Sequence, residues 1–427
     1  MSTEKKNYAL PIAMMFALFF MIAFVTGLPS PMGVIVAKQF KATNFESQLG
    51  FFANFIAYAF MGIPAGIMLK KVGYKKTALT AIFVGFVGVG IQFLSGNLGS
   101  FSVYLAGAFV SGFSMCMLNT VVNPMLNTLG GGGNKGNQLI QFGGSLNSIG
   151  ATITPMLVGY LMGEEAGRTI EKANPALFLA MGIFALAFIV LLFVSMPEPH
   201  MENSNIKKEK ETHSPLSFRH FILGAIAIFV YVGVEVGIPS TANLFMTTAA
   251  EKGGLNIDAT IAGTVVGTYW FLMLIGRLAG GSVGAKISSK AMITFSALLG
   301  ILFLVIAILS SVDTKVYMPV FQSNFSFGLA QVPISIMFIV LCGICTSVMW
   351  GGIFNLAVEG LGKYTAAASG IFMVMVCGGG IIPLLQGFVA DKTTYISSYW
   401  VIFIGMTYIL FYALIGSKNV NKDIVVN

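Results

Sequence analysis

The stretch TALTAIFVGFVGVGIQFLSGNLGSFSVYLAGAFVSGFSMCMLNTVVNPMLNTLGGGGN, residues 77–134, contains no Asp, Glu, Lys or Arg. A helix needs about 20 apolar residues to cross the hydrocarbon core of a membrane. This stretch is long enough for two such helices, and the small polar segment Ser95-Gly-Asn-Leu-Gly-Ser100 divides it. It therefore predicts two membrane-spanning helices joined by a short turn.

Long charge-free runs extend over the rest of the chain. Of its 427 residues 56% are hydrophobic and only 9% are charged, whereas a soluble domain carries about 25% charged residues. The runs are continuously apolar and do not alternate, which favours helices over a membrane barrel. We predict an all-α polytopic membrane protein with twelve spans, at residues 9–36, 47–69, 77–95, 100–128, 137–162, 174–196, 218–248, 259–283, 290–311, 332–358, 364–390 and 396–416.

Lysine and arginine are distributed unevenly between the two sets of connecting loops. With the N-terminus inside, 17 of the 24 Lys and Arg residues lie on the cytoplasmic side. This bias predicts that both termini are cytoplasmic. It also accounts for the net charge of +8 without nucleic-acid binding. No cleavable signal peptide stands out at the N-terminus.

The chain divides into two halves that carry similar motifs. We expect bundles at 1–196 and 218–427, joined by a charged cytoplasmic linker at 197–217. Gly62-Ile-Pro-Ala-Gly66 in the second span corresponds to Gly276-Arg-Leu-Ala-Gly280 in the eighth. A second matching pair lies in the fifth and eleventh spans, around Pro155 and Pro383. Two matches in equivalent spans favour a parallel duplication, as in major facilitator transporters.

Longer motifs resemble one branch of that superfamily, the fucose:proton symporter family, which includes glucose/galactose transporters. The motifs are Asn119-Thr-Val-Val-Asn-Pro124, Asn147-Ser-Ile-Gly150, Tyr231-Val-Gly-Val-Glu235, Tyr269-Trp270 with Gly276-Arg277, and the run from Thr346 to Gly387, which contains Glu359-Gly-Leu-Gly362. The resemblance covers nearly the whole chain. It implies a major facilitator fold of two six-helix bundles and monosaccharide import, by a monomer, across a bacterial inner membrane.

The chain departs from the family pattern at charged positions. The superfamily signature between spans two and three has an acidic residue followed by Arg, where this chain has Lys70 and Lys71. The family's two coupling acids, in spans one and four, correspond here to Ser30 and Asn119. Neither side chain accepts a proton near neutral pH. The family's coupling chemistry therefore cannot be carried over to those two positions.

Glu235 is the only acidic residue deep within a predicted span. An ionisable group inside the membrane costs several kcal/mol and usually marks a pathway. Three interpretations remain open: a coupling site for a proton or sodium ion, a direct acceptor of a sugar hydroxyl, or a structural hydrogen-bonded glutamate.

Other polar and aromatic groups within spans are candidates for lining a sugar path. Amides suit sugar hydroxyls because they donate and accept hydrogen bonds, although they also join helices. The candidates are Asn54, Asn119, Asn123, Gln138, Gln141, Asn147, Asn243, Asn355 and Gln386, with the aromatic rings of Tyr58, Tyr231, Trp270 and Trp350. Lys70, Lys71, Arg277 and Glu359 lie near inner span ends and are candidate gating residues.

Enzymatic and metal motifs are not found. Gly130-Gly-Gly-Gly-Asn-Lys-Gly136 lacks the residues of a phosphate-binding loop, and the pair Cys342 and Cys345 lies inside a span. We expect no catalytic or metal site and no cofactor beyond a coupling proton or sodium ion. We expect a secondary transporter that works by alternating access. The alternatives are an uncoupled sugar facilitator and a transporter of another solute, such as an amino sugar or drug.

Overall fold

The computed structural model describes residues 8–28, 44–162, 173–198, 213–322, 326–421, 423–424 and 426. Its contacts divide the chain into two compact units. The first unit comprises Met1–Pro215, Leu361–Val374 and Val426–Asn427, and the second comprises Leu216–Gly360 and Met375–Val425. Most of the predicted linker, 199–212, lies outside the described residues, as does Ser30. The predicted bundle boundaries therefore stay a prediction.

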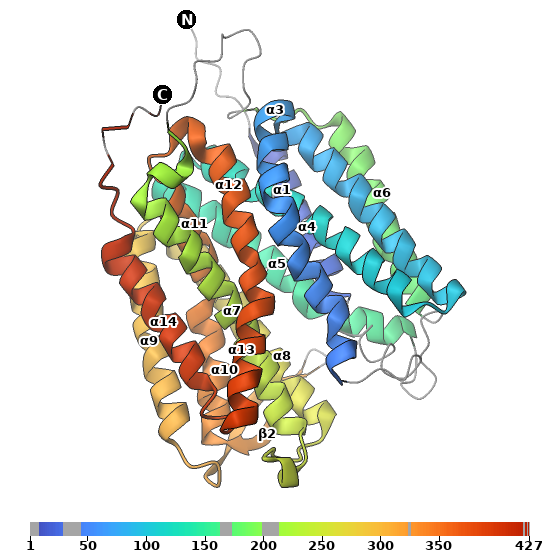
Figure 1. Cartoon of the computed structure of the whole chain (residues 1–427), viewed down its shortest axis with the longest axis vertical. Helices are drawn as coiled ribbons and strands as arrows, with labels where there is room; N and C mark the ends of the chain where they lie inside the picture. Colours follow the sequence, from blue (N-terminus) through green and yellow to red (C-terminus); the bar gives the residue numbers. More distant parts are fainter. Residues whose placement is uncertain are drawn as a thin grey trace, which may run out of the picture. The chain divides into compact units, whose positions relative to one another are not determined.

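In its described residues the first unit contains six α-helices (Figure 1). They are α1 (Ala9–Gly27), α3 (Asn44–Leu98), α4 (Phe101–Leu129), α5 (Gly133–Met162), α6 (Asn174–Phe193) and α12 (Thr365–Val374), the last preceded by the short helix η5 (Gly362–Tyr364). Within this unit α3 packs along α4 and α12, and α1 packs along α5. Residues far apart in the sequence thus share one core.

The second unit holds the remaining elements. They are η3 (Pro215–Ser217, which begins at the boundary), α7 (Arg219–Thr247), η4 (Ala250–Lys252), α8 (Ala259–Val283), α9 (Ser289–Leu309), β1 (Lys315–Phe321), β2 (Phe327–Pro333), α10 (Ile334–Thr346), α11 (Met349–Val358), η6 (Met375–Cys377), α13 (Gly378–Lys392), α14 (Tyr399–Phe411) and η7 (Tyr412–Gly416). Here α7 is the central helix, because it packs against α8, α10, α11, α13 and α14.

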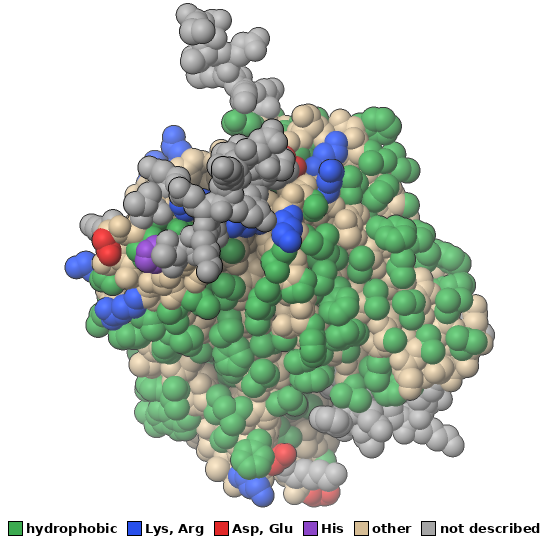
Figure 2. Space-filling view, turned by 45° about the horizontal axis from the view of Figure 1, so that its top comes forward, with side chains coloured by type: hydrophobic (Ala, Val, Ile, Leu, Met, Phe, Trp, Pro, Cys, Tyr) green, Lys and Arg blue, Asp and Glu red, His purple; other side chains and the backbone are tan. Residues whose placement is uncertain are grey.

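Ten helices in the described part of the chain are long and apolar enough to cross a membrane. One of them, in α3, contains two predicted spans, and α5 is a 30-residue helix outside that set of ten. The arrangement is therefore consistent with the twelve predicted spans. Large hydrophobic side chains such as Phe60 and Phe193 point outward, 65% and 85% exposed. Figure 2 shows hydrophobic side chains over much of the drawn face, as expected for a surface in contact with lipid tails.

Two predicted spans meet within α3 at Gly73. Its φ of 85° is left-handed, a conformation that glycine adopts at little cost. The carboxylate of Glu198, just after α6, accepts hydrogen bonds from the backbone N–H groups of Tyr74 and Lys75, the latter at 3.0 Å. A negative group on the free N–H groups at a helix start is stabilising. Glu198 therefore caps the second half of α3.

The segment between the ninth and tenth predicted spans, which its composition led us to interpret as a long polar loop, forms a β-hairpin. β1 pairs antiparallel with β2, with Tyr317 opposite Gln331 and Pro319 opposite Leu329. Met318, Val320, Ala330 and Val332 are buried on one face, but the other face is apolar too at Tyr317 and Leu329. Because both faces carry apolar residues, the alternation typical of a strand was hidden in the sequence.

Candidate functional site

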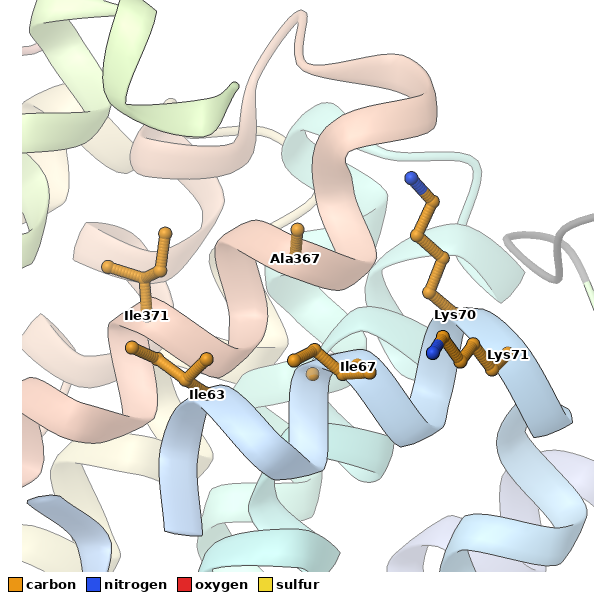
Figure 3. A pocket seen from close by; sticks show the side chains of 7 residues that line it. Ile63, Ile67, Lys70, Lys71, Ala367 and Ile371 are labelled. Carbon is orange, nitrogen blue, oxygen red and sulfur yellow. The ribbon is translucent and has the colours of Figure 1, made fainter. Parts of the chain in front are cut away.

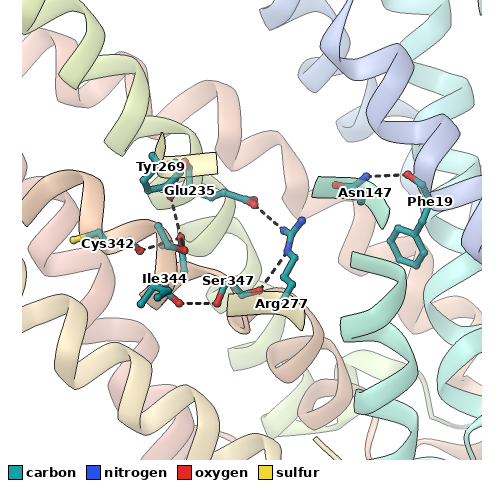
Figure 4. A network of polar contacts seen from close by, with 10 residues as sticks. Phe19, Asn147, Glu235, Tyr269, Arg277, Cys342, Ile344 and Ser347 are labelled. Carbon is teal, nitrogen blue, oxygen red and sulfur yellow. Dashed lines mark hydrogen bonds and ion pairs between the residues drawn. The ribbon is translucent and has the colours of Figure 1, made fainter. Parts of the chain in front are cut away.

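Glu235 pairs with Arg277 in the second unit (Figure 4). The Arg277 Nη2 atom lies 3.0 Å from the Glu235 Oε1 atom, and the two side chains are only 8% and 14% exposed. Glu235 lies in the middle of α7, whereas Arg277 belongs to the last third of α8. A lone charge in this environment would be costly, but a hydrogen-bonded pair of opposite charges is nearly neutral as a whole.

A break in the tenth span lies beside this ion pair. α10 ends at Thr346 and α11 begins at Met349, so Ser347 and Val348 interrupt the helix. The Thr346 hydroxyl donates to the main-chain oxygens of Cys342 and Gly343, and the Ser347 hydroxyl donates to that of Ile344 at 2.6 Å. Hydroxyls that bond to the preceding turn compete with helical hydrogen bonds.

The break supplies a second partner for the arginine. Arg277 Nε donates to the Ser347 main-chain oxygen at 3.3 Å (Figure 4). Irregular backbone at membrane depth is tolerated where protein groups satisfy the freed carbonyls. Arg277 thus joins the Glu235 carboxylate on α7 to the interruption between α10 and α11. A change in the charge of Glu235 would therefore affect Arg277 and, through it, this interruption.

Tyr269 is a further member of this cluster that the sequence argument did not place among the candidate site residues. Its hydroxyl donates to the Glu235 main-chain oxygen at 3.1 Å and lies 3.0 Å from the Thr346 hydroxyl. The side chain is fully buried. The available signal was its position two helical turns before Arg277 on α8, which places both on one helix face.

The predicted aromatic candidates of the second unit lie around the same cluster. Tyr231, one turn before Glu235, is fully buried, and its ring centre lies 6.4 Å from that of Trp350 on α11. Trp270 packs edge to face against Tyr269 at 5.3 Å. The structure therefore brings Tyr231, Trp270 and Trp350 into the surroundings of the ion pair, where flat apolar rings can contact a pyranose face.

The first unit brings together an uncharged group of predicted candidates. Asn119 Nδ2 on α4 donates to the Tyr58 hydroxyl on α3 at 3.1 Å, and Asn123 Nδ2 donates to the Asn119 main-chain oxygen at 2.9 Å. All three side chains are at most 7% exposed. Directly after Asn119, the Thr120 main-chain oxygen accepts a hydrogen bond from the Ser369 hydroxyl of α12 at 3.1 Å. This Tyr58–Asn119–Asn123 cluster offers hydrogen bonds without a charge.

Four further predicted amides lie in the first unit, and three of them have hydrogen-bond partners outside that cluster. Asn147 Nδ2 on α5 donates to the Phe19 main-chain oxygen of α1 at 3.1 Å (Figure 4). Gln141 Nε2 lies 3.4 Å from Asn137 Oδ1 on its own helix, and the neighbouring Gln138 is half-buried. Asn54 Nδ2 reaches the Ala108 main-chain oxygen only at the long distance of 3.5 Å. The Asn147 bond joins two helices.

The remaining amides of the second unit differ in their surroundings. Asn355 Nδ2 donates to the Ser289 hydroxyl at 2.9 Å and joins α11 to the start of α9. Asn243 is exposed. Gln386 on α13 is fully buried, and neither its amide nitrogen nor its amide oxygen has a partner among the described residues. A buried amide without hydrogen-bond partners is costly. Among the predicted amides of this unit, Gln386 is therefore the one that would gain most from a hydrogen bond to a sugar hydroxyl.

Of the predicted gating residues, Arg277 and Glu359 make separate contacts within the second unit. Arg277 bonds to Glu235, as described above, and the main-chain oxygen of Glu359 accepts a hydrogen bond from the buried His220 Nε2 at 2.9 Å. Lys70 and Lys71 lie at one end of a groove between α3 and α12. No group of three or more His, Cys, Asp and Glu side chains that could hold a metal ion occurs among the residues searched, those described above.

Comparison with known proteins places the chain in a family. The model of the Major Facilitator Superfamily matches residues 14–383. The chain is 30% identical to the putative glucose/galactose transporter of Helicobacter pylori, covering 97% of this chain and 98% of that protein. It is 28% identical to the glucose/galactose transporter of Brucella abortus, covering 98% and 97%. The L-fucose-proton symporter of Escherichia coli is 24% identical over 91% of this chain and 88% of its own length.

A solved structure agrees with these sequence matches. The crystal structure of the Escherichia coli fucose:proton symporter superposes with a TM-score of 0.78, covering 97% of this chain and 100% of that one at 20% identity. At this identity the likeness speaks for the fold alone, and it confirms the predicted fold. From the family model and the full-length relatives together, we conclude that the chain belongs to the Major Facilitator Superfamily.

Proposed function

We propose that this protein imports a monosaccharide, driven by a proton gradient, by alternating access across a bacterial inner membrane. Full-length relatives named glucose/galactose transporter and L-fucose-proton symporter support the substrate class. The polar groups of both units support it as well, because sugar hydroxyls need both donors and acceptors. The observation that carries the coupling part is the buried ion pair between Glu235 and Arg277.

The ion pair provides a way to link a proton to a conformational change. A proton on Glu235 would remove the negative charge that balances Arg277, while the Ser347 carbonyl would remain as an uncharged partner. An uncompensated cation at this depth is costly. The protonated state would therefore favour an arrangement in which Arg277 reaches water or another acceptor. A coupled ion can bias two conformations only through such a difference in free energy.

The same geometry favours a proton over a sodium ion. Sodium would need several oxygen ligands around the carboxylate, as the hard cations do. The guanidinium group 3.0 Å from the carboxylate occupies this side and repels a second cation. A proton needs only the carboxylate oxygen itself. We therefore propose Glu235 as the proton acceptor and Arg277 as its counter-charge.

An experiment in proteoliposomes separates the three interpretations of Glu235. Glu235→Gln keeps the shape of the side chain and removes its titration. If Glu235 is the coupling site, the variant loses accumulation against a gradient but retains exchange of labelled for unlabelled sugar. If Glu235 binds the sugar directly, exchange persists with a raised half-saturation concentration. If its role is structural, both activities fall together with the thermal stability of the purified protein.

Glu251→Gln is the matched control, because Glu251 is an exposed acid of the same unit and belongs to no described ion pair. This variant is expected to accumulate sugar as the unmodified protein does. Accumulation by Glu235→Gln at the level of this control would contradict the coupling role. Uptake by the unmodified protein that only equilibrates sugar across the membrane, and that a protonophore leaves unchanged, would favour the alternative of an uncoupled facilitator.

The substrate class has its own test. The unfolding temperature of the purified protein, measured with a panel of hexoses, amino sugars and drugs, is expected to rise only with hexoses. Stabilisation by an amino sugar or drug but by no hexose would replace our assignment with the alternative of another solute.

The orientation and the oligomeric state are also proposals. Seventeen of 24 Lys and Arg residues lie on one side of the predicted spans, which supports cytoplasmic termini. Labelling of single cysteines placed at the two termini from either side of the membrane tests this. We propose a monomer, and the mass of the protein in detergent, measured by light scattering, tests that.

A further inference from the structure

A groove runs along the first unit where α3 passes α12 (Figure 3). It has a volume of about 390 Å³ and is lined by Ile63, Gly66, Ile67, Lys70, Lys71, Ala367 and Ile371. In Figure 3 the isoleucines Ile63 and Ile67 line one wall, and Ala367 and Ile371 line the facing wall. All but the two lysines are apolar, so most of the groove suits a hydrocarbon chain.

Glycines at the crossing of the two helices determine the depth of the groove. A Cβ atom on Gly66 would lie 2.9 Å from the Cα atom of Gly370, and one on Gly370 would lie 2.6 Å from the Gly62 main-chain oxygen. The backbones therefore approach as closely as small residues allow. The isoleucine side chains beside the crossing extend farther than the glycines and form the walls.

The groove opens toward the surroundings of the membrane-spanning segments. Ile63 is 54% exposed and Ile67 is 49% exposed, although both belong to a helix long and apolar enough to span a membrane. Such side chains are stable when lipid tails contact them, but they would be costly in water. Both side chains are therefore expected to face lipid tails, and a lipid of the surrounding membrane can contact them directly.

Two lysines lie at one end of the groove. Lys70 and Lys71 follow Ile67 by one helical turn, Lys70 half-buried and Lys71 exposed. In the orientation proposed above, this end faces the cytoplasmic leaflet. An ammonium group binds phosphate as a point charge, and basic pockets between membrane helices bind the head groups of anionic lipids. The apolar walls and the positive end together match a molecule with an acyl chain and an anionic head group.

We propose that this groove binds one anionic phospholipid of the cytoplasmic leaflet, with an acyl chain against Ile63, Ile67 and Ile371 and the phosphate at Lys70 and Lys71. Free phosphate does not match the site, because the lining beyond the lysines offers no polar partner. The inference concerns lipid binding only and does not depend on which solute is carried. Its test therefore stands or fails separately from the proposed function.

Native mass spectrometry of the full-length protein in detergent tests the proposal. The probes are phosphatidylglycerol, phosphatidylcholine of the same chain length, and inorganic phosphate. We expect retention of one phosphatidylglycerol per chain, weak retention of phosphatidylcholine, and no competition by inorganic phosphate at low millimolar concentration. Equal retention of both phospholipids would overturn the role of the lysines, and displacement by inorganic phosphate would overturn the role of the apolar walls.

Substitutions of single lysines distinguish lipid binding in this groove from nonspecific attraction of the lipid to surface charge. Lys71→Gln should weaken phosphatidylglycerol binding about fivefold, and Lys70→Gln with Lys71→Gln about 30-fold, from the typical contribution of one basic residue near an anionic membrane. Lys76→Gln is the matched control, because Lys76 is exposed nearby on α3 but does not line the groove. An effect of Lys76→Gln as large as that of Lys71→Gln would contradict the proposal.

A variant of the opposite wall keeps both lysines in place. Ala367→Leu adds a branched side chain to the groove and should reduce retention of phosphatidylglycerol at least as strongly as Lys71→Gln. Thermal unfolding without added lipid checks that the variant folds. A folded Ala367→Leu protein that retains phosphatidylglycerol like the unmodified protein would place the lipid elsewhere and would overturn the proposed site.

Discussion

The two units hold polar groups of different kinds within their helices. The first unit has the Tyr58–Asn119–Asn123 cluster, which is joined by hydrogen bonds and carries no charge. The second unit has the ion pair of Glu235 and Arg277 beside a broken helix. The internal sequence matches favour a duplication of one ancestral half. The two units therefore differ in the chemistry of their buried polar groups.

The difference indicates a division of tasks. Neutral amides and hydroxyls change little when a proton gradient is applied, whereas a buried carboxylate paired with arginine responds to it directly. We therefore expect energy coupling to depend on the second unit, while the first unit contributes neutral hydrogen bonds and close helix packing.

The largest effect should follow from removing one member of the ion pair. Arg277→Gln leaves Glu235 without its counter-charge, and breaking a buried pair in this way costs about 3 kcal/mol. We expect a lower free energy of unfolding in detergent and loss of sugar accumulation in proteoliposomes. Adding Glu235→Gln to Arg277→Gln should restore part of the stability, because no uncompensated charge then remains.

A thermodynamic cycle over these variants measures the coupling between the two side chains. If the losses in unfolding free energy of the two single variants add up to the loss of the double variant within about 0.5 kcal/mol, the two side chains do not stabilise each other. That result would contradict the contrast drawn between a charged and an uncharged unit.

Close helix packing in the first unit provides the second test. Gly370→Ala places a methyl group 2.6 Å from the Gly62 main-chain oxygen, so α3 and α12 must move apart at a cost of about 2 kcal/mol. Thermal unfolding measures this cost. Gly182→Ala in α6 is the control, because nothing lies within 4 Å of the added atom. Equal effects of the two substitutions would show that the α3–α12 crossing is not tightly packed.

The uncharged cluster itself should respond more weakly than the ion pair. Asn119→Leu removes the donor to the Tyr58 hydroxyl and leaves that buried hydroxyl poorly satisfied, which costs about 1.5 kcal/mol. Tyr58→Phe combined with Asn119→Leu should cost less than the two single changes together. Unfolding in detergent is again the measurement. A loss for Asn119→Leu that matches the loss for Arg277→Gln would abolish the proposed contrast between the units.

The smallest effects should come from two helix caps at corresponding places. Glu198 accepts bonds from the start of the second half of α3, whereas in the second unit the Ser288 hydroxyl caps α9 by accepting from the Ala291 N–H group at 3.2 Å. Glu198→Gln and Ser288→Ala should each cost about 1 kcal/mol. We expect the larger loss for Glu198→Gln, because its carboxylate is charged and accepts two bonds. The reverse order in unfolding experiments would count against the role of charge at this cap.

Sequence reasoning placed most helices within a few residues of their observed ends. The eighth span was predicted at 259–283, where α8 lies, and the seventh at 218–248, where α7 runs over Arg219–Thr247. Long apolar runs give this accuracy because the membrane requires a fixed length of apolar helix. The hairpin was missed because both of its faces carry apolar residues, and the break at Ser347 was missed because its hydroxyls lie within a continuous apolar run.

For the polar residues, the sequence indicated positions but not contacts. Glu235 was found from the sequence because it is a single acid in the middle of an apolar run. Arg277 was also found, but it was predicted to be a gating residue because it lies near the inner end of its span. Only the packing of α7 against α8 reveals that its side chain extends to Glu235. The contact between the Tyr269 hydroxyl and the Glu235 main-chain oxygen depends on the same packing.

The membrane class and the number and approximate positions of the spans follow from the composition and order of residues along the chain, and the family was predicted from the resemblance of its motifs. Which polar groups meet became visible only in the folded protein: Glu235 with Arg277, Asn119 with Tyr58, and Glu198 with the helix that follows Gly73. Each of these contacts joins residues on different helices, and their distance in space depends on how the helices pack, which no local pattern of residues records.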